Sequence, residues 1–175
     1  MRGVQKRRAA PSLSDGERHR HGATRRLSVA GAVAAVVIVA DQVTKTWAVH
    51  RLQHGPVHFV WKLDLELEFN TGSAFSLMRG WAPILAGVAV AIVVLLLASV
   101  RRVRSDLLAA SVGLVVGGAL GNLADRVFRS HHGAVVDFIA FHFWPTFNLA
   151  DAAIVVGALW AAFLLWRQGS TGESL

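Results

Sequence analysis

The chain has 175 residues, of which 54% are hydrophobic, and its mean hydropathy is +0.47, which is too apolar for an ordinary soluble domain. Its formal net charge of +7 comes from one segment, because residues 1–26 hold eight Lys and Arg against two acids (+6) and the rest hold ten against nine (+1). A basic segment beside a membrane span marks the cytoplasmic side, so we expect no nucleic-acid partner. The absence of cysteine excludes disulfides, thiolate nucleophiles and Cys-ligated metals.

Residues 1–26 mix Arg, His, Ser, Gly and Pro with few large apolar side chains, so we expect a basic, disordered cytoplasmic tail. The apolar run Leu27–Ala40 follows, and with the basic segment before it this run is also compatible with a secretory signal peptide. The apolar pattern resumes beyond Ala40 and continues to Val49, which is long enough to cross a bilayer. We therefore predict a membrane span over residues 27–49.

Three further apolar runs, over residues 81–100, 107–124 and 149–166, are also long enough to span a membrane. The second of them contains Gly113, Gly117, Gly118 and Gly121, small residues that let membrane helices approach closely. Four spans place the N-terminal tail, the basic turn at 101–104 and Arg167 on one side, which then holds twelve of the eighteen basic residues. By the positive-inside rule this side is the cytoplasm, so both termini, including a short tail over 168–175, are cytoplasmic. The sequence predicts an α-helical integral membrane protein with four transmembrane helices.

The segment between the first two spans contains one predicted strand. Apolar and polar residues alternate strictly from Trp61 to Asn70, a period of two that is typical of a half-buried strand, here at the membrane surface. A loop at 54–56 precedes the strand, and a turn at Thr71-Gly72 follows it.

Four aspartates fall near the outer ends of the predicted spans. Asp41 lies in the first span, Asp125 at the end of the third, Asp137 in the loop after it and Asp151 at the start of the fourth. An ionised carboxylate in hydrocarbon costs roughly 2.5–3.5 kcal/mol, so such acids are candidates for a functional site. Acids at one depth favour a site, whereas scattered acids would favour a transport pathway through the bilayer.

Two of these acids have a basic neighbour in the sequence. Lys45 follows Asp41 by four residues, on the same helix face, which predicts a structural polar pair. Asp125 is adjacent to Arg126 and suggests the same, although neighbouring helix positions do not face each other and each side chain could pair elsewhere. We expect structural roles for Asp41, Lys45 and Asp125.

Asp137 and Asp151, fourteen positions apart, have no such neighbour; the nearest basic residues are Arg129 and Arg167. Uncompensated acids beside apolar residues should have raised pKa values, which would let one carboxyl stay protonated while the other acts as a base. The alternatives are a proton relay in a small membrane transporter or binding module, and, for Asp151, a capping role in the first turn of a helix. Asn148, three residues before Asp151, could face the same site and orient an aspartate.

Other chemistries have weaker support. His131, His132 and His142 could form a metal site with Asp137, but their spacing fits no fixed ligand pattern. Ser73, Ser76 and Ser111 lack the nearby Lys or His that would activate a nucleophile.

Five motifs, in order, resemble those of lipoprotein signal peptidase (signal peptidase II), a family of aspartyl peptidases. They are DQVTK (41–45), FNTGSAF (69–75), GNLADR (121–126), VVDF (135–138) and FNLAD (147–151). The resemblance covers about residues 40–157. It implies an endopeptidase of the bacterial cytoplasmic membrane, with four spans over 27–167 and a small extracytoplasmic β-sheet, the β-cradle.

Such enzymes remove signal peptides from diacylglyceryl-modified prolipoproteins just before the lipidated cysteine, and they use no metal or other cofactor. The resemblance places a catalytic pair at Asp137 and Asp151, near the outer leaflet. It implies supporting or substrate-binding roles for five other residues: Asn70, Gly72, Asn122, Arg126 and Asn148. It also implies inhibition by the cyclic peptide globomycin, contact with membrane lipids and, as we expect, a monomer. The N-terminal tail is long for the family, and the interval between the two aspartates is short.

Overall fold

The computed structural model describes residues 15–71, 105–129 and 133–172. These residues form three long helices: α1 (Asp15–Leu52), α3 (Asp106–Phe128) and α4 (Leu149–Gly172). All three contain apolar stretches long enough to cross a membrane, which confirms long apolar helices at the first, third and fourth predicted spans. The second predicted span, over 81–100, lies outside the described residues.

Helix α1 is longer at its N-terminus than predicted. It begins at Asp15, so the prediction of a disordered segment is wrong for residues 15–26, while residues 1–14 lie outside the described part. Only the nucleation of a helix is costly, and the membrane span supplies a nucleus from which the helix extends at little cost. Arg25 also forms an exposed ion pair with Asp106, the first residue of α3. In the same way α4 continues to Gly172, into the tail predicted from residue 168.

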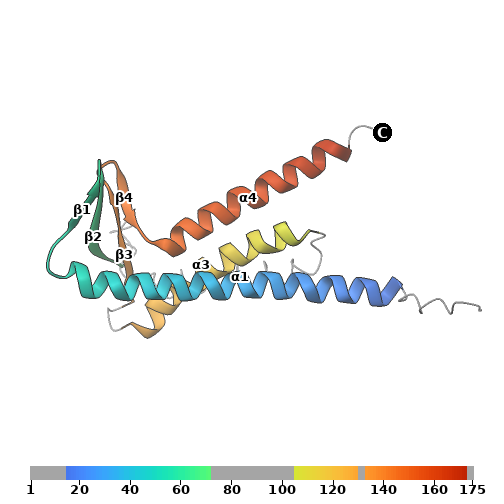
Figure 1. The fold of residues 1–175 in the computed structure, drawn as a ribbon, viewed down its shortest axis with the longest axis horizontal. Helices are drawn as coiled ribbons and strands as arrows, with labels where there is room; N and C mark the ends of the chain where they lie inside the picture. Colours follow the sequence, from blue (N-terminus) through green and yellow to red (C-terminus); the bar gives the residue numbers. More distant parts are fainter. Residues whose placement is uncertain (1–14, 72–104, 130–132, 173–175) are drawn as a thin grey trace, which may run out of the picture.

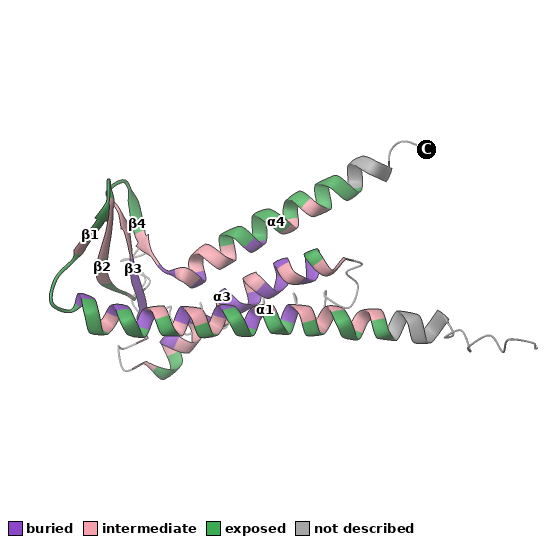
Figure 2. Ribbon diagram, in the orientation of Figure 1, coloured by how far each residue is buried: buried purple, intermediate pink, exposed green. Residues whose placement is uncertain are grey.

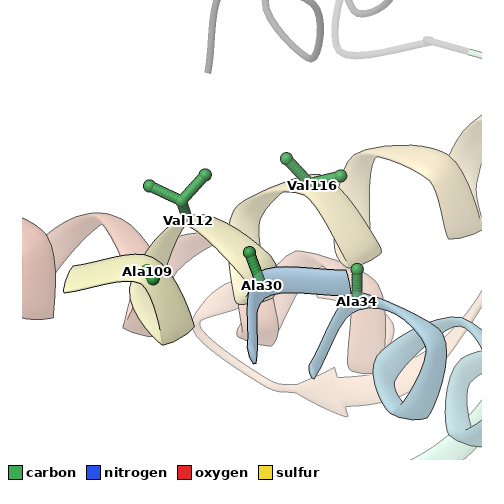
Figure 3. Close-up of a cluster of buried hydrophobic side chains, with 5 residues drawn as sticks. All are labelled: Ala30, Ala34, Ala109, Val112 and Val116. Atoms are coloured by element: carbon green, nitrogen blue, oxygen red, sulfur yellow. The ribbon is translucent and has the colours of Figure 1, made fainter. Parts of the chain in front are cut away.

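Helix α3 packs against both α1 and α4. Its contact with α1 is a cluster of small buried side chains, shown in Figure 3: Ala30, Ala34, Ala109, Val112 and Val116. A Cβ atom at Gly113 would lie 2.6 Å from the carbonyl oxygen of Ala30, and one at Gly121 would lie 2.6 Å from Oδ2 of Asp41. The predicted role of these glycines in close helix packing is therefore confirmed. Figure 2 shows the contrast between the largely buried α3 and the more exposed α4.

A four-stranded antiparallel sheet lies at one end of the helices (Figure 1). Its strands, in spatial order, are β1 (Val57–Val60), β2 (Leu63–Asn70), β3 (Val135–Phe141) and β4 (Trp144–Phe147). The predicted strand is confirmed over residues 63–70. Trp61 and Lys62 instead form the hairpin turn before β2, where Trp61 has a φ of +53°.

The sequence pattern does not predict the other three strands. The first four residues of β3 are buried, so its sequence is apolar on both sides of Asp137 and lacks the alternation of a half-buried strand. The sheet is held to the end of α1 by an apolar cluster around Ala48, Leu52 and Phe138. The register of β2 on β3 pairs Glu68 with Asp137 and Asn70 with Val135, which brings Asn70 and Asp137 to the same end of the sheet.

Candidate active site

The four aspartates singled out in the sequence come from four different elements and belong to one hydrogen-bond network. Asp41 lies on α1, Asp125 on α3, Asp137 on β3 and Asp151 in the first turn of α4. The side chains of Asp41 and Asp125 are fully buried, Asp137 is 1% exposed, and Asp151 is half-buried. Their partners divide them into two groups.

Asp41 and Asp125 share the ammonium group of Lys45. The Nζ atom of Lys45 lies 2.9 Å from Oδ2 of Asp41 and 3.0 Å from Oδ2 of Asp125, and all three side chains are inaccessible to solvent. The predicted pair of Asp41 and Lys45 is thus confirmed, with Asp125 as a third member. The other oxygen of Asp41 accepts the backbone N–H of Ala150 at 3.0 Å, which fastens the start of α4 to α1. Buried charges need such mutual compensation, because removal of one partner leaves the other unpaired.

Asp125 connects α3 to both α1 and β3. Its Oδ1 accepts hydrogen bonds from Gln42 and Arg129, each at 2.9 Å, and its Oδ2 accepts the backbone N–H of Val136 at 3.0 Å. The cationic partners of Asp125 are therefore Lys45 and Arg129. The suggested pair with adjacent Arg126 does not form, and the alternative that Asp125 pairs elsewhere holds, because consecutive helix residues point in different directions. Within the described part of the chain, half-buried Arg126 makes no hydrogen bond or ion pair.

Asp137 is held by amides instead of cations. Nδ2 of Asn148 donates to its Oδ1 at 2.6 Å, and Nδ2 of Asn70 donates to its Oδ2 at 2.9 Å. Burial raises the pKa of Asp137 to about 6, although the hydrogen bonds from Asn70 and Asn148 act in the opposite direction. The negative charge of Asp151 adds to the increase, so the two carboxyl groups interact electrostatically.

Asp151 and Asn148 form a reciprocal cap at the start of α4. The backbone N–H of Asp151 donates to Oδ1 of Asn148 at 3.0 Å, and the backbone N–H of Asn148 donates to Oδ2 of Asp151 at 3.2 Å. This is the hydrogen-bond pattern of a capping box, with an aspartate in the position where Glu is usual. The capping role considered for Asp151 is therefore present, as is the predicted proximity of Asn148 to both aspartates. The remaining oxygen, Oδ1 of Asp151, accepts a bond from Nδ2 of Asn122 at 2.8 Å.

Asn122 joins the charged group to the amide-bound group. Its Oδ1 accepts hydrogen bonds from Nζ of Lys45 at 2.8 Å and from Nδ2 of Asn148 at 3.1 Å, while its Nδ2 donates to Asp151. Because Lys45 donates to the oxygen, the orientation of the amide is determined: its NH₂ group faces Asp151. Asn148 is likewise fully buried, with its NH₂ group shared between Asn122 and Asp137.

Other predicted participants lie elsewhere. Gly72 falls outside the described residues, as do His131 and His132. His142 lies 3.0 Å from Asp64, on a different part of the sheet from Asp137, and His58 lies 2.5 Å from the same carboxylate. The hydrogen bond with His142, and to a smaller extent the one with His58, lowers the pKa of Asp64. The described residues contain no group of three potential ligands that could hold a metal ion.

Two residues of the network were not identified as site residues from the sequence. Gln42 follows Asp41 directly and donates to Asp125 and to the carbonyl of Gly121. Arg129 follows Asp125 by four residues, a spacing that places the two on one helix face and that could have indicated the pair.

The arrangement contains two kinds of acid. The first kind is neutralised by cations and ties helices and strands together. The second kind, Asp137 and Asp151, is held in place by neutral amides, and the two groups are close enough to affect one another. Two such carboxyls can share a proton, which is the arrangement needed to activate water with one group and to protonate an oxygen with the other.

Comparison with known proteins gives the family. Residues 33–167 match the family model of signal peptidase (SPase) II. The lipoprotein signal peptidase of Rhodococcus jostii (strain RHA1) is 43% identical over 132 residues, which are 73% of this chain and 67% of that protein. The lipoprotein signal peptidase of Azoarcus sp. (strain BH72) is 42% identical over 151 residues, 81% and 82% of the two chains.

The lipoprotein signal peptidase of Mycobacterium tuberculosis (strain ATCC 25618 / H37Rv) is 40% identical over 149 residues, 82% of this chain and 74% of that one. Two solved structures, each described as a bacterial membrane enzyme studied by the in meso method, share the fold, with TM-scores of 0.72 and 0.74 and identities of 25% and 24%. They cover 79% and 85% of this chain, and 92% and 93% of their own. The chain therefore belongs to the signal peptidase II family of lipoprotein signal peptidases.

Proposed function

We propose that Asp137 and Asp151 are the catalytic pair with which this member of the family removes signal peptides from prolipoproteins, cutting just before the diacylglyceryl-modified cysteine. One observation carries the assignment: Asn148 donates its side-chain amide to Asp137 and its backbone N–H to Asp151, and neither acid forms an ion pair in the described part of the chain. Carboxyl groups that are shielded from water and form no ion pair are costly, and such positions are typical of functional sites.

The two carboxyls have different roles in the proposed reaction. Asp137 holds the shared proton, because burial raises its pKa to about 6, and donates it to the oxygen of the scissile carbonyl. Asp151, oriented by Asn122 and the cap at Asn148, accepts a proton from the attacking water. The proton returned to the leaving amine then comes from this same pair. The chemistry requires only the chain's own carboxyls.

Supporting residues follow from the network. Asn70 and Asn148 orient Asp137, and Asn122 orients Asp151. Arg126, half-buried and without a partner in the described residues, is available to contact the substrate. We include Gly72 among the substrate-binding residues on the strength of the FNTGSAF motif alone.

The proposal includes a position in the bacterial cytoplasmic membrane. We infer that residues 81–100 form a fourth span, that both termini are cytoplasmic, and that the four-stranded sheet is an extracytoplasmic cradle beside the outer leaflet. The basic residues at the opposite end of the helices, such as Arg25, support this orientation through the positive-inside rule. The acylated cysteine of the substrate would then reach the site from the lipid. We further propose that the enzyme acts as a monomer and is inhibited by globomycin-type cyclic peptides.

Cleavage of a purified, diacylated prolipoprotein tests the proposal. The wild type should release the signal peptide, whereas Asp137→Asn and Asp151→Asn should not, although both remain folded. Asp64→Asn is the matched control: it changes an acid on the same sheet that contacts His58 and His142 instead of the network, and it should retain activity. Full turnover by either dyad variant would refute the assignment. No cleavage by the wild type would favour a transporter or binding module.

A further inference from the structure

We propose that Arg129 is a positioning residue for this site, which fixes Asp125 so that Asp125 can hold β3 beside the reacting carboxyls. The inference rests on the proposed catalytic pair and concerns a residue outside the five family motifs. The Arg129 side chain is only 17% exposed, although the residue lies just beyond the end of α3.

The guanidinium of Arg129 links α3 to α1 through several hydrogen bonds. Its Nε donates to Oδ1 of Asp125 at 2.9 Å. Its Nη2 donates to the carbonyl oxygen and the side-chain oxygen of Gln42 at 3.3 and 3.2 Å, and to Oγ1 of Thr46 at 3.0 Å. The backbone N–H of Arg129 also donates to the carbonyl of Asp125, which closes the C-terminus of α3. Asp125 is thereby clamped from the side that faces away from β3.

The other oxygen of Asp125 connects to the strand that carries Asp137. Oδ2 of Asp125 accepts the backbone N–H of Val136 at 3.0 Å. Val136 directly precedes Asp137, so this bond restrains the peptide next to the catalytic carboxyl. A rotation of the Asp125 carboxylate would move or release this anchor. The Arg129 guanidinium, through Oδ1, prevents such a rotation.

The charge count of the buried group supports the same role. Asp41 and Asp125 carry two negative charges, which Lys45 and Arg129 balance with two positive charges. Without Arg129 one buried carboxylate would have no cation of its own. An arginine is suited to the position because its planar fork can donate to Asp125 and Gln42 at once, whereas a lysine amine is a single point of charge.

The test compares Arg129→Ala and Arg129→Lys with a control, Arg51→Ala, which removes an exposed arginine from the last turn of α1. Full-length proteins are assayed on the diacylated prolipoprotein, and hydrogen–deuterium exchange is followed at the Val136 amide. For Arg129→Ala we expect kcat to fall about tenfold or more, because small displacements of reacting groups are costly, with KM within about twofold of the wild type. The Val136 amide should exchange faster. Arg129→Lys should recover part of kcat, and Arg51→Ala should match the wild type.

A merely structural role would give a different result. Activity would then fall only in proportion to the folded fraction, measured by thermal unfolding in the same detergent, and kcat per folded molecule would be unchanged. That outcome would overturn the proposal, as would a rise in KM at constant kcat or an unchanged Val136 exchange rate. If Arg129→Ala does not fold, Arg129→Lys decides: lowered kcat at unchanged KM, with faster Val136 exchange, supports the proposal, and wild-type values reject it.

Two controls separate this inference from the catalytic assignment. In an Asp125→Asn background, Arg129→Ala should have little further effect on kcat, because both changes break the same link; additive losses would show that Arg129 acts by another route. Asp137→Asn and Asp151→Asn are assayed in parallel. Activity in these variants would refute the catalytic pair, whereas inactive pair variants together with wild-type kcat in Arg129→Ala would refute only the role of Arg129.

Discussion

The site contains two sets of aspartates that differ in the groups that bind their carboxylates. Asp41 and Asp125 lie against Lys45, and Asp125 also pairs with Arg129, so their charges are neutralised. Asp137 and Asp151 are bound by the amides of Asn70, Asn122 and Asn148, which orient a carboxylate but carry no charge. The same residue type in the same region is thus ion-paired in one set and, in the other, held by neutral amides at the positions that we propose as catalytic. The first set is bound by cations, which favour the charged form of the carboxylates, and the second is bound by neutral amides. For this reason we propose only the second set for proton exchange.

The two sets are mechanically connected, and this connection gives the two ion-paired acids a role at the site. Asp125 holds the backbone of Val136, and Asp41 holds that of Ala150. Each structural acid therefore anchors a residue immediately before a proposed catalytic one. Asn122 completes the link, since it contacts both Lys45 and Asp151.

The largest expected effect comes from the amide-bound set. We expect Asp137→Asn to reduce kcat by at least about a thousandfold, because removal of one member of a catalytic unit removes most of its contribution. Stability should not fall at pH 7, since the change removes an acid whose pKa is raised from 3.8 to about 6. Cleavage rate and thermal unfolding temperature, measured on one preparation, check both parts.

The sign of the stability effect can be checked by pH. Ionisation of a group with a raised pKa destabilises the folded state, so the wild type should lose stability as pH rises from about 4 to above 6, by up to about 3 kcal/mol. Asp137→Asn lacks this loss. The advantage of the variant should therefore shrink below pH 4; an advantage that is constant with pH would argue against a buried, titrating Asp137.

A change in the cation-paired set should reduce folding stability, whereas a change in the amide-bound set reduces kcat alone. Lys45→Met leaves Asp41 and Asp125 without the ammonium group that they share, and we expect a loss of about 3–5 kcal/mol in folding stability. Activity should be lost because the protein unfolds. Unfolding in a lipid-like detergent, followed by circular dichroism, measures the effect, and Asp64→Asn serves as the control. An undiminished unfolding temperature would show that the distinction between the two sets is wrong.

The pH dependence of cleavage sharpens the comparison further. If Asp137 must be protonated to act as the acid, kcat/KM should decrease as pH rises through about 6, because the free enzyme then loses this proton. Assays between pH 4.5 and 8.5 in buffers of constant ionic strength measure this limb. A rise in kcat/KM across the same range would exchange the acid and base roles of Asp137 and Asp151.

The smallest effect is expected at Asn70. Its amide lowers the pKa of Asp137 by stabilising the carboxylate, so Asn70→Leu should raise that pKa and shift the alkaline limb of the profile to higher pH. The comparison of wild-type and variant profiles measures the shift. Gln53→Leu, an exposed change at the end of α1, is the control. A shift toward lower pH in Asn70→Leu would contradict the hydrogen bond as the cause.

Local features account for what could be predicted from the sequence. Long apolar runs indicated three helices that the structure describes, and the four-residue spacing of Asp41 and Lys45 indicated their pair. Asn148 and Asp151, three residues apart, were placed at one site because a helix start brings them together. The five motifs identified the family. The sequence pattern did not predict β1 and β4, which are only four residues long, or β3, because a strand that is largely buried lacks an alternating pattern.

The sequence by itself determined the membrane class, the helices and the two acids without cationic neighbours, because these depend on runs and spacings within one element. Only the tertiary structure decided which partner each acid has. Asn70 reaches Asp137 across 67 positions, and Lys45 reaches Asn122 across 77. Such contacts depend on the register of β2 on β3 and on the close packing of α1 against α3, in which Gly113 and Gly121 leave no room for a side chain. The pairing of Asp125 with Lys45 and Arg129 instead of Arg126 follows from that geometry.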